Sequence, residues 1–124
     1  MTTTATPPQF SAAALLSAID AMDVDGFVAH LAEDVRFRFG NGARVIGRRA
    51  VRNAVGDFFT TIRGLRHELL DQYADGDRRV LETDVTYTRL DGADVTLPVV
   101  SVLHLGGNLV TDYRVYVDLA PVYA

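Results

Sequence analysis

Hydrophobic residues recur at helical spacing in three segments of the first half of the chain, residues 10–22, 26–34 and 48–62. Thr6 or Ser11 could cap the first of these helices, because a hydroxyl before the first turn accepts a hydrogen bond from a free backbone N–H. The third segment has the longest apolar stripe, and such a stripe must pack against another element. We therefore expect three helices in this part of the chain.

The second half of the chain follows a period of two, which is typical of strands with one buried face. A short strand is expected at residues 35–39, “VRFRF”, and Gly-containing turns separate the later strands. Helices followed by hairpins indicate an α+β fold in which the third helix covers one face of an antiparallel sheet. The four later strands are expected at about residues 65–73, 78–89, 95–105 and 109–118.

Charged residues gather on one side of two of these strands. Burying a lone carboxylate costs several kcal/mol, so we expect the charged sides of the strands to face solvent and Asp112 to pair with Arg114 there. The uncharged, inward sets are Leu81, Thr83, Val85 and Tyr87 in one strand, and Leu109, Thr111, Tyr113, Val115 and Val117 in the last.

The strand “VTLPVVSVLHL” is apolar on both faces, unlike its neighbours. Val100 and Val102 lie on the face that should be solvated, with Tyr116 and His104 nearby. A strand with one wet side should not have this pattern. We therefore expect a second subunit to cover the outer face of the sheet, and the protein to be a homodimer.

The length of 124 residues suits one domain, expected at residues 9–124 after a disordered tail at residues 1–8. The chain has no cysteine and no lysine, which excludes disulfides, thiol nucleophiles and Schiff-base chemistry. No apolar run is long enough to span a membrane. A cytoplasmic location is expected, and the residue usage is typical of a GC-rich bacterial genome.

Six arginines fall between Arg36 and Arg52, yet the net charge is −4 and no aromatic residues alternate with them in a recognition helix. We therefore expect no nucleic-acid partner. His30, His67 and His104 are far apart in the sequence and form no ligand pair. Neither a metal ion nor an organic cofactor is expected.

Several segments together resemble a known family. A first helix is followed by “FVAHLAEDVRFRFGN” and “VIGRRAVRNAVGDFF”, and the hairpins end on “GGNLVTDYRVYVDLAPV”. From about residue 10 onward this order resembles the SnoaL-like branch of the nuclear transport factor 2-like superfamily. The resemblance implies a cone-shaped, curved antiparallel sheet packed on about three N-terminal helices, with an apolar pocket inside.

That superfamily includes ketosteroid isomerases, polyketide cyclases, limonene epoxide hydrolases, dehydratases and binding domains without catalysis. Where the epoxide hydrolases have an arginine and two aspartates, this chain has Thr83, Val85 and Val115. Their Tyr and Asn pair falls at Phe39 and Asn41, so only the Asn is present. The carboxylates of the ketosteroid isomerases are absent as well.

The expected pocket has few polar groups. His30 is the candidate base, because histidine suits proton transfer near neutral pH, and Tyr87 and Tyr113 are candidate donors to an oxyanion. The structural interpretation is favoured for each of them: His30 as a partly exposed structural residue, the tyrosines as buried rings, and Asn41 as a turn residue. The other expected pocket residues are Phe37, Phe39, Phe58, Thr83, Val85, Ser101, Thr111 and Val115.

Two functional hypotheses follow. In the first, the protein holds a small apolar, ring-bearing molecule, and catalysis is not required. In the alternative, it is an isomerase, cyclase or dehydratase that uses acid–base chemistry on a steroid- or polyketide-like substrate. The missing inward carboxylates favour the first hypothesis, because proton abstraction beside a carbonyl needs a base.

Overall fold

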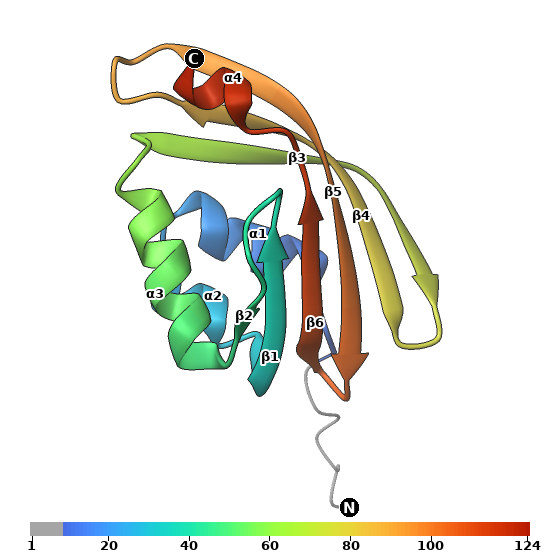
Figure 1. The fold of residues 1–124 in the computed structure, drawn as a ribbon. Helices are drawn as coiled ribbons and strands as arrows, with labels where there is room; N and C mark the ends of the chain where they lie inside the picture. The colour runs from blue at the N-terminus through green and yellow to red at the C-terminus, as the bar shows by residue number, and fades with distance from the viewer. Residues whose placement is uncertain (1–8) are drawn as a thin grey trace, which may run out of the picture.

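Three helices lie inside the curve of a single sheet in the computed structural model, which describes residues 9–124 (Figure 1). The expected tail at residues 1–8 lies outside the described residues. The helices are α1 (Ala12–Asp20), α2 (Val24–Val28) and α3 (Arg48–Phe59). A fourth, short helix, α4 (Ala120–Tyr123), follows the last strand and is not predicted by the sequence pattern.

The six strands form a curved sheet that does not close, in the order β2-β1-β6-β5-β4-β3. Neighbouring strands are antiparallel except β1 and β6, which are far apart in the sequence and pair in parallel. This architecture confirms the predicted α+β class and the four predicted C-terminal strands. The strands are β1 (Leu31–Phe39), β2 (Val45–Ile46), β3 (Gly64–Asp75), β4 (Arg78–Thr88), β5 (Asp94–Gly106) and β6 (Leu109–Tyr116).

The first two helices begin at capping side chains. The Ser11 hydroxyl accepts a hydrogen bond from the Ala14 N–H at 3.1 Å, and the Asp23 carboxylate accepts one from the Gly26 N–H at 3.0 Å. Each bond satisfies one of the backbone donors that a helix start leaves free. Ser11, one of the two predicted caps, is therefore the cap of α1.

The predicted second helix is too long. Helix α2 ends at Val28, and β1 begins at Leu31, inside the segment expected to be helical. Strand β6 explains the difference, since Leu31 is the register partner of Val110, whose N–H donates to the His30 carbonyl oxygen at 2.9 Å. Pairing with a distant strand here outweighs the local helical pattern.

The predicted strand faces are correct on β4, where Leu81, Thr83, Val85 and Tyr87 are all buried. On β6 the prediction is correct only from Asp112 onward. A bulge between β5 and β6 shifts the register, so that Val110 is fully buried and Leu109 is exposed, the reverse of the expectation. An extra residue in a bulge turns the following side chains to the opposite face.

The charged positions of β6 lie on the outer face, as predicted. Asp112 faces away from the helices and pairs with Arg114 at 3.2 Å and with Arg36 at 3.5 Å. Although only 11% of the Asp112 side chain is exposed, both arginines reach it from the outer face. The interior of the curve is left to apolar and aromatic side chains.

Candidate functional site

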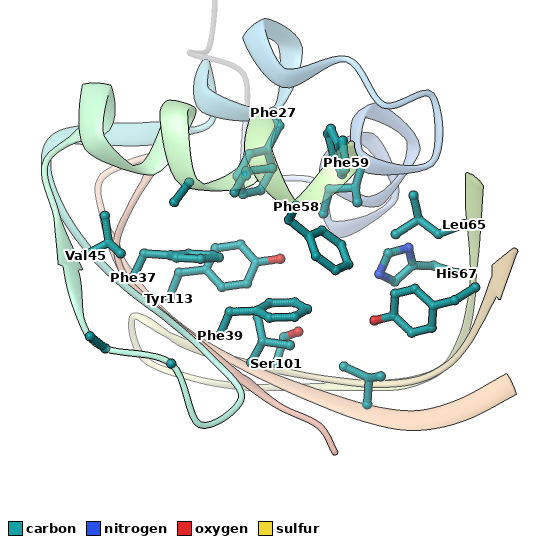
Figure 2. Close-up of a pocket in the computed structure, with 18 residues that line it drawn as sticks. Phe27, Phe37, Phe39, Val45, Phe58, Phe59, Leu65, His67, Ser101 and Tyr113 are labelled. Atoms are coloured by element: carbon teal, nitrogen blue, oxygen red, sulfur yellow. The ribbon is translucent and has the colours of Figure 1, made fainter. Parts of the chain in front are cut away.

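A cavity of about 230 Å³ lies between the helices and the concave face of the sheet, as Figure 2 shows. Strands β1, β5 and β6 contribute one wall, and helices α1, α2 and α3 contribute the opposite wall. Strands β2, β3 and β4 and the loop between β1 and β2 complete the lining. Of the eighteen lining residues, only four have polar side-chain atoms: His67, Tyr87, Ser101 and Tyr113.

Aromatic rings form a continuous series around this cavity. Phe37 and Phe39, successive inward residues of β1, stack with their centroids 6.4 Å apart. Phe37 contacts Tyr113 at 5.4 Å, Phe39 contacts Phe58 of α3 at 5.0 Å, and Phe58 meets Tyr87 edge to face at 6.2 Å. These separations are typical of stabilising aromatic pairs. The rings therefore hold one another in place and give the cavity apolar walls.

His67 is the one imidazole on the cavity wall, and it is held by Asp20, the last residue of α1. The His67 Nδ1 atom lies 2.5 Å from Asp20 Oδ1. The backbone N–H of His67 also donates to the same carboxylate, at 3.1 Å to Oδ1 and 3.0 Å to Oδ2. Since a carboxylate only accepts, Nδ1 of the neutral ring has to carry the proton, which leaves a lone pair on Nε2.

The free nitrogen of His67 is accessible from the cavity. Figure 2 shows the imidazole ring pointing into the cavity toward Phe58. Nε2 makes no hydrogen bond within residues 9–124. Every fully enclosed side-chain nitrogen or oxygen in these residues has a hydrogen-bond partner, so Nε2 is not fully enclosed. The lone pair of Nε2 is therefore open to whatever occupies the cavity. Histidines oriented by a carboxylate in this way serve as bases in many active sites.

The two cavity tyrosines are both buried, with 2% exposure each. Burial raises the pKa of Tyr87 and of Tyr113 far above the usual value, because the phenolate would lose its hydration. A hydrogen bond with the Ser101 side chain opposes this rise for Tyr113, without cancelling it. Both hydroxyls stay protonated over the physiological range and can donate hydrogen bonds into the cavity.

The structure brings seven of the twelve residues expected from the sequence to the cavity wall. They come from β1, α3, β4, β5 and β6, so their side chains converge only through the fold. The seven are Phe37, Phe39, Phe58, Tyr87, Ser101, Tyr113 and Val115.

The other five expected residues do not line the cavity. His30 lies half-buried in the turn between α2 and β1, where burial lowers its pKa. Asn41 is exposed in the turn after β1, and Val85 is fully buried in the core. The Thr83 hydroxyl donates to the Val99 carbonyl at 2.8 Å, and the Thr111 hydroxyl, displaced by the β6 bulge, donates to the His104 carbonyl at 3.2 Å.

Sequence reasoning missed the His67–Asp20 pair. One signal was present, because Leu65, His67 and Leu69 alternate along one strand and therefore share a face. The inward face of β3 was thus readable. Asp20 gave no comparable signal, since it ends a helix forty-seven positions before His67 and only the packing of α1 on β3 brings the two together.

The described part of the chain has neither a metal-binding cluster nor a membrane-spanning helix. No cluster of three or more His, Asp or Glu side chains between residues 9 and 124 could hold a metal ion. Over the same residues, no helix has both the length and the hydropathy needed to cross a membrane. The cytoplasmic location expected from the sequence stays a prediction.

The curved sheet around three helices defines the class of fold, and comparison with known proteins gives the family. The family model described as the SnoaL-like domain matches residues 12–113, so the chain belongs to the SnoaL-like family. This confirms the resemblance that the sequence motifs indicate. No match was found among curated protein sequences.

Solved structures share the fold at low sequence identity. One is a protein of ketosteroid isomerase-like fold from Catenulispora acidiphila, solved in complex with trimethylamine. It is 18% identical with a TM-score of 0.82, and the alignment covers 89% of this chain and 86% of that protein. TerC, which was co-crystallised with polyporic acid, is 19% identical with a TM-score of 0.79, and the alignment covers 90% of this chain and 91% of TerC. An epoxide hydrolase of M. tuberculosis is 21% identical with a TM-score of 0.75, and the alignment covers 90% of this chain and 82% of the hydrolase.

Proposed function

We propose that this SnoaL-like domain binds a small, uncharged, ring-bearing molecule in its cavity and transfers a proton on it, with His67 as general base. The single observation that carries the proposal is the Asp20-bound imidazole on the wall of an otherwise apolar cavity. Structural relatives crystallised with trimethylamine and with polyporic acid support the use of this fold for small molecules.

The size of the cavity limits the ligand. An apolar protein cavity of about 150 Å³ holds benzene, so about 230 Å³ suits a molecule of one or two rings. The aromatic walls favour a flat ligand, and each Å² of apolar surface removed from water contributes about 25 cal/mol. The lining has no carboxylate, arginine or lysine to pair with a charge. A charged ligand would lose its hydration without compensation, so the expected ligand is neutral.

The proposed reaction is an internal proton shift. Nε2 of His67 takes a proton from a carbon next to the ligand's carbonyl group, and the electrons of that C–H bond move onto the carbonyl oxygen. A tyrosine hydroxyl, from Tyr87 or Tyr113, donates a hydrogen bond to the resulting oxyanion. The imidazolium, stabilised by the Asp20 carboxylate, returns the proton to the far carbon of a C=C bond that is conjugated with this enolate. The oxyanion re-forms the carbonyl group, and the double bond moves next to it. The product is an isomer, and no co-reactant is consumed.

The same proton transfers would serve a cyclase or a dehydratase, as the sequence suggested. A second candidate is binding without catalysis, favoured by the small polar share of the lining. The two candidates differ in what His67 does. Catalysis requires its lone pair, whereas binding requires only the apolar walls.

The test uses a panel of small ketones, including cyclohex-3-enone and 2-tetralone. Ligand binding is measured as the rise in Tm, and proton transfer as deuterium uptake at the carbon beside the carbonyl, followed by NMR in heavy water. We expect His67→Gln to lower the exchange rate by about 10²–10⁴-fold while the rise in Tm persists. If the variant exchanges as fast as the wild type, His67 is not the base.

The cavity itself is tested with a matched pair on α3. Ala54 lines the cavity, whereas Ala50 lies on the exposed side of the same helix. We expect Ala54→Phe to fill the cavity and abolish both the ligand-induced rise in Tm and the exchange, and Ala50→Phe to leave both unchanged. Retention of both effects in Ala54→Phe would place the ligand elsewhere.

A further inference from the structure

The polar side chains of the cavity form two separate pairs, and the first pair is His67 with Tyr87. His67 of β3 is the register partner of Val85 on β4, and Tyr87 comes two positions after Val85 on the same face. Such diagonal neighbours of an antiparallel pair are about 7–8 Å apart, which is within reach of an aromatic side chain. We call this pair the histidine end of the cavity.

Ser101 and Tyr113 form the second pair, which we call the serine end. Ser101 of β5 is the register partner of Val115 on β6, and Tyr113 comes two positions before Val115, in the same diagonal arrangement. The Ser101 side chain forms a hydrogen bond with Tyr113. Two hydroxyls that share one hydrogen bond keep one donor and several lone pairs free. This pair can therefore still bind a neutral oxygen group of a ligand.

The two ends lie far apart across the sheet. Strands β4 and β5 lie between β3 and β6, so His67 and Tyr113 are three strand spacings apart, about 14 Å along the sheet. Figure 2 shows these two residues on either side of Phe58. The rings between the ends follow one another in this order: Tyr87, Phe58, Phe39, Phe37 and Tyr113. A ligand that reaches both ends has to be apolar in its middle.

The Tyr87 hydroxyl is available to a ligand at the histidine end. It makes no hydrogen bond within residues 9–124, whereas the Tyr113 hydroxyl is engaged by Ser101. Every fully enclosed side-chain oxygen in these residues has a hydrogen-bond partner, so the Tyr87 oxygen is not fully enclosed. The carbon that loses its proton is bonded to the carbonyl carbon, so the base and the oxyanion donor have to act at the same end of the ligand.

We propose that the ligand is a two-ring ketone with a second neutral oxygen group at its far end, an inference that rests on the proposed function. The carbonyl group lies at the histidine end, where Tyr87 is the donor to the oxyanion. The second oxygen, of a hydroxyl, ether or carbonyl group, binds Tyr113 and Ser101. A ligand without this oxygen would leave the spare hydroxyl proton of the serine end against apolar surface, which costs binding free energy.

The serine end is tested with ketones that differ at one position. In 6-hydroxy- and 7-hydroxy-2-tetralone the added oxygen is on the ring that lacks the carbonyl group, and the 6-methyl and 7-methyl analogues have a group of similar size there. Binding is measured by titration calorimetry. We expect Tyr113→Phe and Ser101→Ala each to weaken binding of at least one hydroxy compound by about tenfold, and binding of its methyl analogue much less. Tyr116→Phe, exposed on the same strand as Tyr113, should have no effect.

The histidine end is tested by deuterium exchange at saturating ketone. We expect Tyr87→Phe to lower the exchange rate by about 10²–10³-fold for hydroxy and methyl compounds alike. Circular dichroism checks that each variant is folded. The inference is overturned if Tyr113→Phe and Ser101→Ala do not discriminate between the compounds, or if the saturated rate falls with Tyr113→Phe instead of Tyr87→Phe.

Failure of the proposed function gives a different result. Equal exchange in the wild type and in His67→Gln would refute the proposed base and with it the role of Tyr87, while the affinities would still decide the role of Tyr113 and Ser101. A wild-type chain that binds none of the four ketones would overturn both proposals.

Discussion

Asp20 determines which nitrogen of His67 faces the cavity. Its carboxylate accepts from the backbone N–H of His67 and lies 2.5 Å from Nδ1, so the ring orientation and the proton position are fixed by the same group. Asp20 does not line the cavity and would not touch a ligand. It is a positioning residue, and its role can be separated from that of the base.

Replacing Asp20 by asparagine should move the proton of His67. An amide can keep the backbone hydrogen bond through its oxygen and donate from its NH₂ group to Nδ1, which then leaves the proton on Nε2. We expect the ¹⁵N signals of His67 to change from the Nδ1–H to the Nε2–H pattern. Because Nε2 then offers no lone pair to the ligand, the ketone exchange rate should fall about as far as in His67→Gln, by about 10²–10⁴-fold, and the ligand-induced rise in Tm should persist.

A nearby aspartate provides the control. Asp23 caps α2, and asparagine is as good a capping residue as aspartate. Asp23→Asn should therefore leave the His67 signals and the exchange rate unchanged. Unchanged ¹⁵N signals in Asp20→Asn would show that Asp20 does not set the proton position.

At the level of elements, helix α3, which carries Phe58 into the cavity, has two glycines to compare. Gly47 lies at its start and Gly56 lies within it. Gly47 precedes the first turn with φ of +96°, a conformation that other residues rarely adopt. Gly56 lies inside the helix, and an added Cβ there would meet nothing within 4 Å. The same substitution should therefore have opposite effects at the two positions.

We expect Gly47→Ala to lower the free energy of unfolding by about 1–3 kcal/mol, because alanine would be strained at this backbone conformation. Gly56→Ala should raise it by about 0.5–1 kcal/mol, since alanine restricts the unfolded chain and favours the helix. Chemical denaturation followed by circular dichroism measures both changes. A stabilising effect at Gly47 would show that the start of α3 has another backbone conformation.

The elements also show how far the sequence predicts this fold. Periods of 3.6 and 2.0 locate three helices and five of the six strands, because burial on one face imposes them locally, whereas the two-residue β2 was not predicted. The faces of β4 are correct for the same reason. On β6 the bulge beside His104 reverses Leu109 and Val110, and a bulge depends on the neighbouring strand rather than on the local pattern. Helix α2 is overpredicted because β6 extends β1 backward to Leu31.

In the candidate site, too, the features set by local periodicity could be predicted and those set by distant contacts could not. The aromatic lining was predictable, since inward positions on amphipathic strands and helices can be read from their spacing. The His67–Asp20 pair was not, because it depends on α1 crossing β3 at a particular place. Contacts between elements distant in the sequence carry no local periodicity, and here they supply the groups with chemistry.

At the scale of the whole molecule, the buried tyrosines connect the cavity to the stability of the fold. Tyr87 and Tyr113 belong to the core, and burial raises the pKa of each hydroxyl. In the unfolded chain both have a pKa of about 10. Below that pH both states keep the protons, and stability does not depend on these groups. Above it the unfolded chain loses protons that the folded chain retains, so the free energy of unfolding falls as pH rises.

Each tyrosine should contribute a slope of up to about 1.4 kcal/mol per pH unit above pH 10. Urea denaturation of the wild type between about pH 9 and 11.5 should therefore show a steep loss of stability, and Tyr113→Phe should show a smaller one. The variant with both Tyr87→Phe and Tyr113→Phe should be the least sensitive. The difference between the curves of the three proteins reports the two buried hydroxyls. Parallel curves would mean that the hydroxyls already reach solvent in the folded state, and the cavity would then be too wet to keep them as donors to a ligand.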